Sequence, residues 1–383
     1  MESKEVNTRD EELHLFILWS NARDKEKEIL HDIGEAFTIR RVFDVAWPKK
    51  TFDENLSRFY GTSIPGGIDK GAHAGRGDFL LVVVDDHEPD YDHHETSKGT
   101  RHVNSKMFLA KQSHREWTGG GHKVHATDTI TETDHDLALL LGLNTHDFNE
   151  KYPGSETKPI KWKKPLVGAD GWESLEQLLY TFNATTDYVV LRNFDMLPGE
   201  YYAEQHGDID LMVRDYELAN IILGGKAVFP EDHRVHKSVQ IAGEEVLFDL
   251  RFKGDEYYDE QWQEEILATR ELHPNGFYIP SNENHAQSLL YHALIHKPAV
   301  NPDYVEQLER MFEKPIFDGD VNSLDQAKSI LAKFMAKKDY RLTTAVDISV
   351  YKHEQNFSDV WHVMRKTRPA HYALKRAKRL LKN

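Results

Sequence analysis

Two aspartates, Asp208 and Asp210, lie two residues apart within the stretch 206–213, which also contains four apolar residues. Side chains of a β-strand alternate between its two faces, so both carboxylates project from one face and the intervening apolar residues from the other. Neighbouring carboxylates repel each other, and a divalent cation relieves that repulsion. Mg²⁺ commonly binds one or two carboxylates and completes its shell with water and substrate phosphate oxygens. The pair therefore predicts a Mg²⁺ site, or a Mn²⁺ site, at the front of a sheet, used to transfer a phosphate-containing group.

A third carboxylate follows on a second alternating segment. In the stretch 246–252, Asp249 and Arg251 share one face and apolar side chains occupy the other. If this strand pairs beside the first, Asp249 joins Asp208 and Asp210 in one cluster. We expect these three aspartates to be both the catalytic residues and the metal ligands. The alternative is that the Asp-x-Asp pair lies in a solvated turn or at a strand edge.

A further strand is predicted at 187–193, before the Asp-x-Asp segment. The order of a strand, a Gly-Asp-x-Asp strand and an Asp-bearing strand resembles the nucleotidyltransferase superfamily with the DNA polymerase β-like core. The resemblance covers roughly Tyr188 to Phe252. That family places a Gly-Ser pair after its first core strand, where its amides hold nucleotide phosphates. This chain has Arg192-Asn193 there, so a guanidinium would take the place of the amides.

The resemblance implies roles for the charged residues around the cluster. Asp208 and Asp210 would hold the metal and the donor phosphates, and Asp249 would complete a second metal site or act as a base toward the acceptor. Three cations are candidates to neutralise the developing phosphate charge, and these are Arg192, Arg251 and Lys253.

A helix predicted over 282–296 carries His292 and His296 four residues apart on one face. Helices after the third carboxylate often line the pocket in enzymes of this superfamily, which implies that both histidines contact the nucleotide or the acceptor. Their spacing suits a metal, but the glutamate of a His-Glu-x-x-His zinc motif is missing. The alternative is a hydrogen-bonded histidine pair on a partly buried helix.

The segment 191–298 is also similar to proteins of bacterial surface-polysaccharide gene clusters, which implies a glycan or another small molecule as the acceptor. The donor would be a nucleoside triphosphate. Two alternatives stay open: a glycosyltransferase or phosphotransferase that uses a sugar nucleotide, and a non-catalytic nucleotide-binding module. Lys plus Arg number 48 against 64 Asp plus Glu, a net charge of −16, so no nucleic acid partner is expected.

A second candidate anion site lies in the N-terminal part. Three glycines, Gly119 to Gly121, stand between Arg115 and the pair His122-Lys123. Glycines let a backbone approach a ligand closely and present its amides to an anion. The run of Gly120, Gly121, His122 and Lys123 is similar to the Gly-x-His-Arg-x-x-Ala phosphate-contact motif of the ParB/sulfiredoxin fold. The alternative is a flexible glycine turn between a helix and a strand.

Composition bounds the class of protein and its location. The 383 residues contain no cysteine, which excludes disulfides, thiolate metal sites and cysteine nucleophiles. No apolar run approaches the roughly 20 residues that a membrane-spanning helix needs, and the start of the chain lacks a secretory signal. We expect a cytoplasmic protein. The basic tail 365–382 could lie on the inner membrane face as a peripheral contact, or it could be a solvated helix.

Strand and helix signals alternate along the chain and predict an α/β (α+β) protein. An N-terminal α/β domain is expected over 10–150, followed by a linker over 151–168, which is rich in lysine and contains three prolines. A nucleotidyltransferase-like mixed sheet is expected over 169–300. A helical C-terminal region with the basic tail would complete the chain over 301–383.

Overall fold

The computed structural model describes residues 11–61, 70–97, 99–201, 208–230, 234–317 and 324–352. The chain divides into two compact units, the first with residues 1–186, 217–224 and 240–244, and the second with residues 187–216, 225–239 and 245–383. Each unit is built around a five-stranded sheet with helices, and the second sheet mixes parallel and antiparallel neighbours. The α/β class predicted from the sequence is therefore confirmed.

The first sheet has the strand order β6-β1-β3-β2-β7. β3 runs antiparallel to β1 and β2, β6 antiparallel to β1, and β7 parallel to β2. α1 connects β1 to β2 and α4 lies between β3 and β6, as in the β-α-β-β-α-β arrangement of ferredoxin-like folds. The bounds of these elements are β1 (Glu12–Leu18), α1 (Glu26–Ala36), β2 (Thr38–Val45), β3 (Phe79–Asp86), α4 (Ser105–Trp117), β6 (Val124–Ala126) and β7 (Glu156–Trp162).

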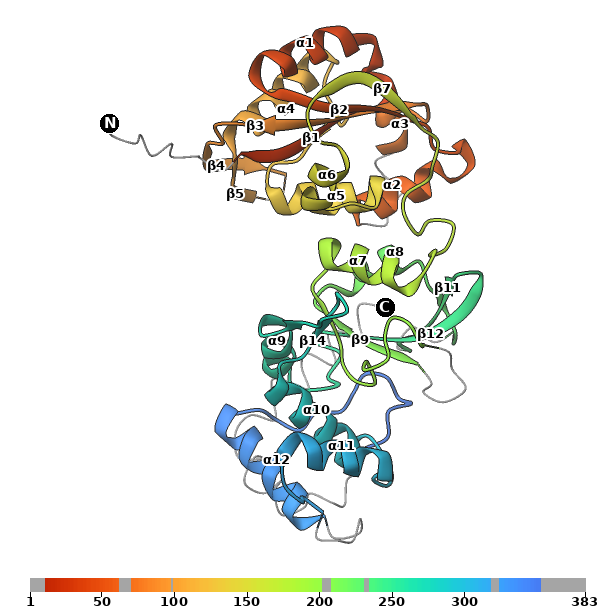
Figure 1. Cartoon of the computed structure of the whole chain (residues 1–383), viewed down its shortest axis with the longest axis vertical. Helices are drawn as coiled ribbons and strands as arrows, with labels where there is room; N and C mark the ends of the chain where they lie inside the picture. The colour runs from red at the N-terminus through yellow and green to blue at the C-terminus, as the bar shows by residue number, and fades with distance from the viewer. Residues whose placement is uncertain are drawn as a thin grey trace, which may run out of the picture. The chain divides into compact units, whose positions relative to one another are not determined.

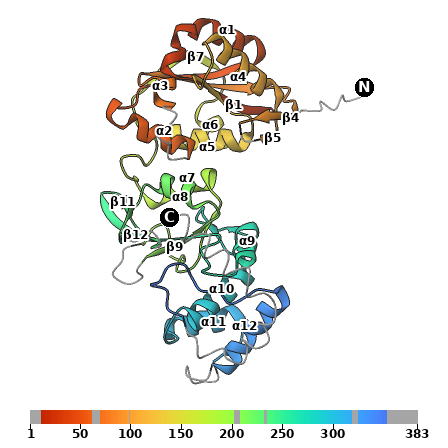
Figure 2. The same ribbon diagram turned by 180° about the vertical axis from the view of Figure 1, so that it is seen from behind.

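Helices cover both faces of this sheet (Figures 1 and 2). On one face, Ile33 of α1 and Met107 of α4 belong to the same buried cluster as Phe16 of β1. On the other face, the ring of Phe52 in α2 lies 6.3 Å from that of Trp19, which follows β1. Because both faces are covered, every residue of β3 is buried, as its continuous apolar run predicts. The other helices of the unit are α2 (Phe52–Tyr60), α3 (Lys70–Ala74), α5 (Ile130–Leu141), α6 (Thr145–Lys151), α7 (Leu175–Thr185) and α8 (Tyr216–Leu223), with short 3₁₀ turns at Ser20–Lys25 and Lys49–Thr51.

Two segments of the first unit differ from what the sequence indicated. We expected a linker over 151–168, but Glu156–Trp162 within it forms β7 and pairs with β2 at the edge of the sheet. The first unit therefore continues beyond residue 150, and its main stretch ends at 186. The polar segment before α4 forms an additional hairpin of β4 (Tyr91–Thr96) and β5 (Gly99–Asn104), whose side chains are mostly exposed.

The second sheet has the strand order β10-β11-β12-β9-β8. β8 runs antiparallel to β9, and β9 runs parallel to β12 in a register that places Asp210 opposite Asp249. The pairing required for the carboxylates to meet is therefore present. The strands are β8 (Tyr188–Val190), β9 (Ile209–Val213), β10 (Lys226–Ala227), β11 (His236–Ile241) and β12 (Glu244–Phe252).

Four helices pack on the aspartate-bearing face of β9. Met212 shares the face of Asp210, because the two are two residues apart in a strand, and Met212 belongs to one buried cluster with Trp262, Leu290 and Leu331 of these helices. Asp210 therefore lies on the face of the sheet against which these helices pack. The helices are α9 (Glu260–Ala268), α10 (Asn282–Ile295), α11 (Pro302–Phe312) and α12 (Asp325–Lys338), and a short pair β13 (Glu271–Leu272) and β14 (Tyr278–Ile279) joins α9 to α10.

The boundary expected at residue 300 is absent, because α11 and α12 contribute Leu308 and Leu331 to the same buried cluster as α10. The described part of the expected helical C-terminal region is thus part of the second unit. The predicted final helix and the basic tail 365–382 lie outside the described residues. Among the helices that are described, none has both the length and the apolar character required to cross a membrane.

Candidate active site

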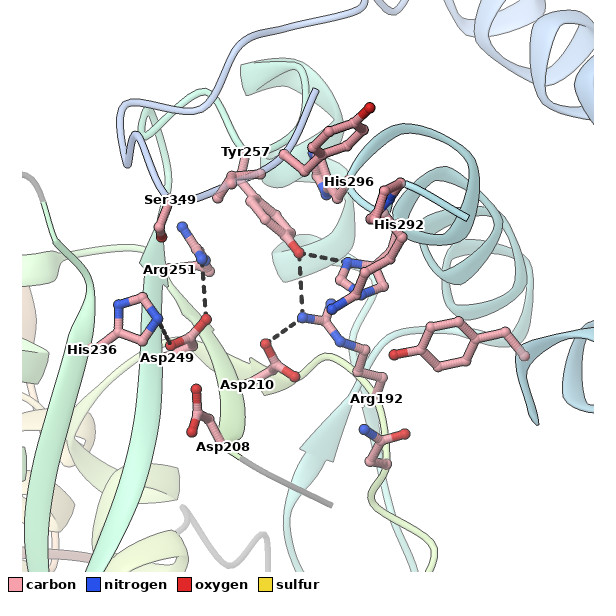
Figure 3. Close-up of a pocket in the computed structure, with 16 residues that line it drawn as sticks. Arg192, Asp208, Asp210, His236, Asp249, Arg251, Tyr257, His292, His296 and Ser349 are labelled. Carbon is pink, nitrogen blue, oxygen red and sulfur yellow. Dashed lines mark hydrogen bonds and ion pairs between the residues drawn. The ribbon is translucent and has the colours of Figure 1, made fainter. Parts of the chain in front are cut away.

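The three aspartates line one cavity of about 430 Å³ in the second unit (Figure 3). Asp210 comes from β9, Asp249 from β12, and Asp208 from the residue immediately before β9. Cations and aromatic rings line the same cavity: Arg192, His236, Arg251, Tyr257, His292, His296, Lys297 and Tyr304. The cavity therefore combines carboxylates that can hold a metal with groups that can hold an anion.

Asp208 and Asp249 lie close enough to share a cation. One carboxylate oxygen of each lies within 4.8 Å of the other and of a ring nitrogen of His236. Burial and the neighbouring charge of Asp249 raise the pKa of Asp208, with His236 acting in the opposite direction. Like charges held together in this way favour a bound cation.

Asp210 is paired with a cation of the protein itself. Its carboxylate Oδ1 accepts a hydrogen bond from Nη2 of Arg192, the residue that follows the end of β8 by two positions. Asp210 and Arg192 are each only 7% exposed. Burial raises the pKa of Asp210 to about 6, the carboxylate of Asp249 adds to the shift, and Arg192 opposes it.

Arg251 is the second buried cation of the site. Its Nη2 donates to Oδ2 of Asp249 at 3.0 Å, and its guanidinium carbon lies 4.4 Å from the centre of the Tyr257 ring. Nε and Nη1 of Arg251 are buried and have no hydrogen-bond partner among the described residues, and Nη1 lies 3.6 Å from Oδ2 of Asp347. A guanidinium whose N–H groups are not all hydrogen-bonded can donate to an oxyanion ligand.

Tyr257 links the arginines to the two histidines of α10. Its hydroxyl oxygen accepts a hydrogen bond from Nη2 of Arg192 at 3.3 Å and lies 2.8 Å from Nδ1 of His292. The ring of His296 lies 4.1 Å from that of Tyr257. Burial first, and then the nearby arginines, hold the pKa of both histidines well below the usual value. They are therefore neutral near pH 7, and any contact they make with a phosphate is that of a neutral N–H donor.

His236 is a site residue that we did not single out from the sequence. It lies at the start of β11, with Nε2 3.2 Å from Oδ1 of Asp249 and Nδ1 3.7 Å from Oδ2 of Asp347. The sequence does contain a signal for it. Ala242 and Gly243 both have positive φ and form the turn between β11 and β12. Counting outward from a two-residue turn places residue 236 opposite Asp249.

Lys253 does not line the cavity. Its Nζ donates to Oε2 of Glu264 at 2.6 Å, and Glu264 also pairs with Arg214. Two of the three cations expected at the phosphate, Arg192 and Arg251, therefore lie with the carboxylates. The third, Lys253, forms a separate ion pair.

The N-terminal anion-site residues lie in the first unit, at the end of α4. Arg115 donates from Nε to the carbonyl of Val124, and Lys123 donates from Nζ to the carbonyl of Thr118. The backbone N–H of Gly120 donates to the carbonyl of Arg115 at 2.7 Å. Gly119, Gly120 and Gly121 all have φ near +80°, which a glycine adopts readily. His122 is exposed, and its ring stacks at 6.3 Å on that of His73. Anion binding here stays a prediction.

No family model matches the chain, and no curated protein matches it. Among solved structures, a nucleoside diphosphate kinase of Aquifex aeolicus is similar over 34% of this chain and 94% of its own, at 14% identity and a TM-score of 0.24. At that score the similarity supports no assignment of function.

Proposed function

We propose that the chain is a Mg²⁺-dependent nucleotidyltransferase, with its active site in the cavity of the second unit. One observation carries the proposal: Asp208, Asp210 and Asp249 share a cavity with two buried arginines, Arg192 and Arg251. Carboxylates that can hold a metal, next to guanidinium groups, are the combination needed to bind and polarise a phosphate. The proposal agrees with the resemblance to nucleotidyltransferases described above.

The donor set fits a divalent cation. Oδ1 of Asp249 is buried without a hydrogen-bond partner in the described part of the chain, and the pKa values of Asp208 and Asp210 are raised by burial and mutual repulsion. Asp208, Asp210 and Asp249 would hold the metal. When bound, Mg²⁺ or Mn²⁺ would neutralise charge on the donor phosphates and assist the departure of the leaving group.

The chain's own residues would orient the donor and stabilise its charge. Arg192 and Arg251 would hold the donor phosphate, and the neutral rings of His292 and His296 would donate hydrogen bonds to the donor or the acceptor. An acceptor oxygen forms a bond to the donor phosphorus as the bond from phosphorus to the pyrophosphate oxygen breaks. The acceptor proton passes to a carboxylate of the cluster, and pyrophosphate leaves.

The acceptor in this proposal is a small molecule or a glycan, because the chain is acidic overall, with a net charge of −16, and would repel a nucleic acid. We place the reaction in the cytoplasm, where nucleoside triphosphates are available. The proposal includes a peripheral contact of the basic tail 365–382 with the inner membrane face.

The test is a screen of the full chain against nucleoside triphosphates and sugar nucleotides with Mg²⁺. Thermal shift would detect binding, because a ligand of the folded state raises its stability. Product analysis would detect turnover with candidate glycan acceptors. Release of pyrophosphate from a triphosphate is the expected result. Release of a nucleoside diphosphate from a sugar nucleotide would instead show a glycosyltransferase, and binding without turnover would show a non-catalytic module.

A further inference from the structure

His236 lies between two carboxylates that come from different parts of the second unit. Nε2 faces Oδ1 of Asp249 at 3.2 Å, and Nδ1 faces Oδ2 of Asp347 at 3.7 Å (Figure 3 shows His236 beside Asp249). Neither carboxylate oxygen makes a hydrogen bond within the described part of the chain, although both are buried. The imidazole is thus held in position by two anions, with neither contact made as a hydrogen bond.

The Nε2 side of this ring faces a set of ligand atoms of the right number and spacing for one ion. One atom from each of Asp208, His236 and Asp249 lies within 4.8 Å of the other two. Asp249 is only 8% exposed and lines the cavity, and its buried Oδ1, which faces Nε2 of His236, has no hydrogen-bond partner among the described residues. A single cation between the three side chains would therefore satisfy a buried oxygen that otherwise lacks a donor.

The Nδ1 side faces the kind of group that usually supports a metal-ligating histidine. Such a histidine directs its second nitrogen at a carboxylate or carbonyl, which fixes the ring and its tautomer. Asp347 is 2% exposed and is itself fixed by the backbone N–H and the hydroxyl of Ser349, which donate to its Oδ1 at 2.9 and 2.7 Å. Two arginines also face Asp347, with Nε of Arg234 3.3 Å from its Oδ1 and Nη1 of Arg251 3.6 Å from its Oδ2. These contacts hold Asp347 in place beside His236.

Asp210 is the carboxylate of the cluster that stands apart, because its Oδ1 is already bound to Arg192. From this arrangement we infer that Asp208, His236 and Asp249 are the primary metal ligands and that Asp347 is a positioning residue for His236. The inference rests on the proposed function for the presence of a divalent cation at the carboxylates. An imidazole ligand favours a first-row transition ion over Mg²⁺, so the site should bind Mn²⁺ more tightly than Mg²⁺.

The test uses Mn²⁺ as the probe on the full chain, without substrate. Electron paramagnetic resonance titration gives the dissociation constant, and electron spin-echo modulation detects a nitrogen bound to Mn²⁺. We expect ¹⁴N modulation in the wild-type protein and its loss in His236→Gln, together with at least a tenfold weaker Mn²⁺ affinity. Asp347→Asn should retain the modulation but weaken Mn²⁺ binding about tenfold. His102→Gln, at an exposed position in the first unit, is the matched control and should change neither reading.

The outcomes separate this inference from the proposed function. Suppose that Mn²⁺ binds, that Asp208→Asn abolishes this binding, and that the wild-type spectrum lacks ¹⁴N modulation. The metal site is then supported, and the assignment of His236 as a ligand is wrong. If the wild-type protein binds neither Mn²⁺ nor Mg²⁺, both proposals fail. Absence of ¹⁴N modulation in the wild-type spectrum rejects the assignment even if His236→Gln does not fold, and modulation that persists in a folded His236→Gln would come from His292 or His296 of the same cavity and would also reject it. Competition with Mg²⁺ gives a further reading, since the preference for Mn²⁺ should shrink in His236→Gln.

Discussion

Arg192 donates a hydrogen bond to Asp210 where both side chains are almost fully buried. When no nucleotide is bound, the guanidinium of Arg192 neutralises the charge of the Asp210 carboxylate. A bound phosphate would offer the guanidinium a second anionic partner, and a bound cation would offer the same to the carboxylate. When both ligands enter the cavity, Arg192 can therefore bind the phosphate and Asp210 can bind the cation.

The Arg192–Asp210 pair should show strong coupling in a double-mutant cycle. Removing one partner of a buried ion pair leaves an unpaired charge and costs about 3–5 kcal/mol. We expect Arg192→Ala to lower the free energy of unfolding by about that amount, and Arg192→Ala with Asp210→Asn to lower it less. Urea unfolding of the four proteins measures the cycle. Simple additivity of the two single changes would show that the pair contributes no coupling.

Asp208→Asn should abolish turnover without harming the fold. Burial and the charge of Asp249 raise the pKa of Asp208, so a neutral side chain removes repulsion from the metal-free protein. We expect an unchanged or higher melting temperature without metal, and loss of the rise in melting temperature that Mg²⁺ produces in the wild type. EDTA should abolish wild-type activity. Asp170→Asn, at an exposed turn of the first unit, is the control, and activity that survives EDTA would contradict a metal-dependent mechanism.

Arg251 and Lys253 should differ sharply in their importance for activity. Arg251 lines the cavity and has buried donors left over, whereas Lys253 pairs with Glu264. We expect Arg251→Gln to lower kcat by roughly 100-fold or more, the range for removing a donor that stabilises transition-state charge. Lys253→Gln should change kcat less than threefold, because it removes only an ion pair near the surface. Such a pair contributes about 0.5 kcal/mol to stability. Equal losses in the two variants would argue against this placement of the phosphate.

Acid should destabilise the second unit through its buried histidines. Burial lowers the pKa of His285 to about 4, whereas an unfolded histidine has a pKa of about 6.5. Between these two values the unfolded state binds more protons. The free energy of unfolding therefore falls as the pH drops, by about 1.4 kcal/mol per pH unit for each such residue. Above pH 6.5 and below pH 4, His285 adds no slope.

The measurement is urea unfolding between pH 7 and pH 4.5. His285→Gln should reduce the slope by about one proton. The remaining slope should combine the contributions of His292 and His296, whose pKa values burial also lowers, with an opposite contribution from Asp210, whose pKa burial raises to about 6. His31→Gln, at an exposed position, is the control. A slope identical in His285→Gln and the wild type would contradict the assignment.

Apolar patterning predicted the strand over 246–252 and the helix over 282–296, which coincide with β12 and α10. β7 was not recognised because it is an edge strand with lysines and a proline and mostly exposed side chains, which resembles a linker in composition. The β4–β5 hairpin was missed for the same physical reason, because few of its residues are buried.

The carboxylates were identifiable because the two-residue period of a strand fixes which residues share a face. Predicting the position of His236 requires the register between β11 and β12 in addition to the period of a strand. Asp347 lies in a segment after α12 that has no regular secondary structure. The position of Asp347 follows from the packing of the second unit and has no local signal. Lys253 shows the converse, since its sequence position suggested a phosphate contact and Glu264 of α9 binds it instead.

The chain enters and leaves the second unit more than once, because residues 217–224 and 240–244 belong to the first. A gene fragment ending at residue 186 would lack α8 and the β11–β12 turn, and the complementary fragment would carry both without the rest of their unit. Neither unit corresponds to an uninterrupted length of gene. Recombination at a single point therefore cannot exchange one unit for that of another protein. The two units are expected to be inherited together, with insertions tolerated at their surface loops and not at a junction between them.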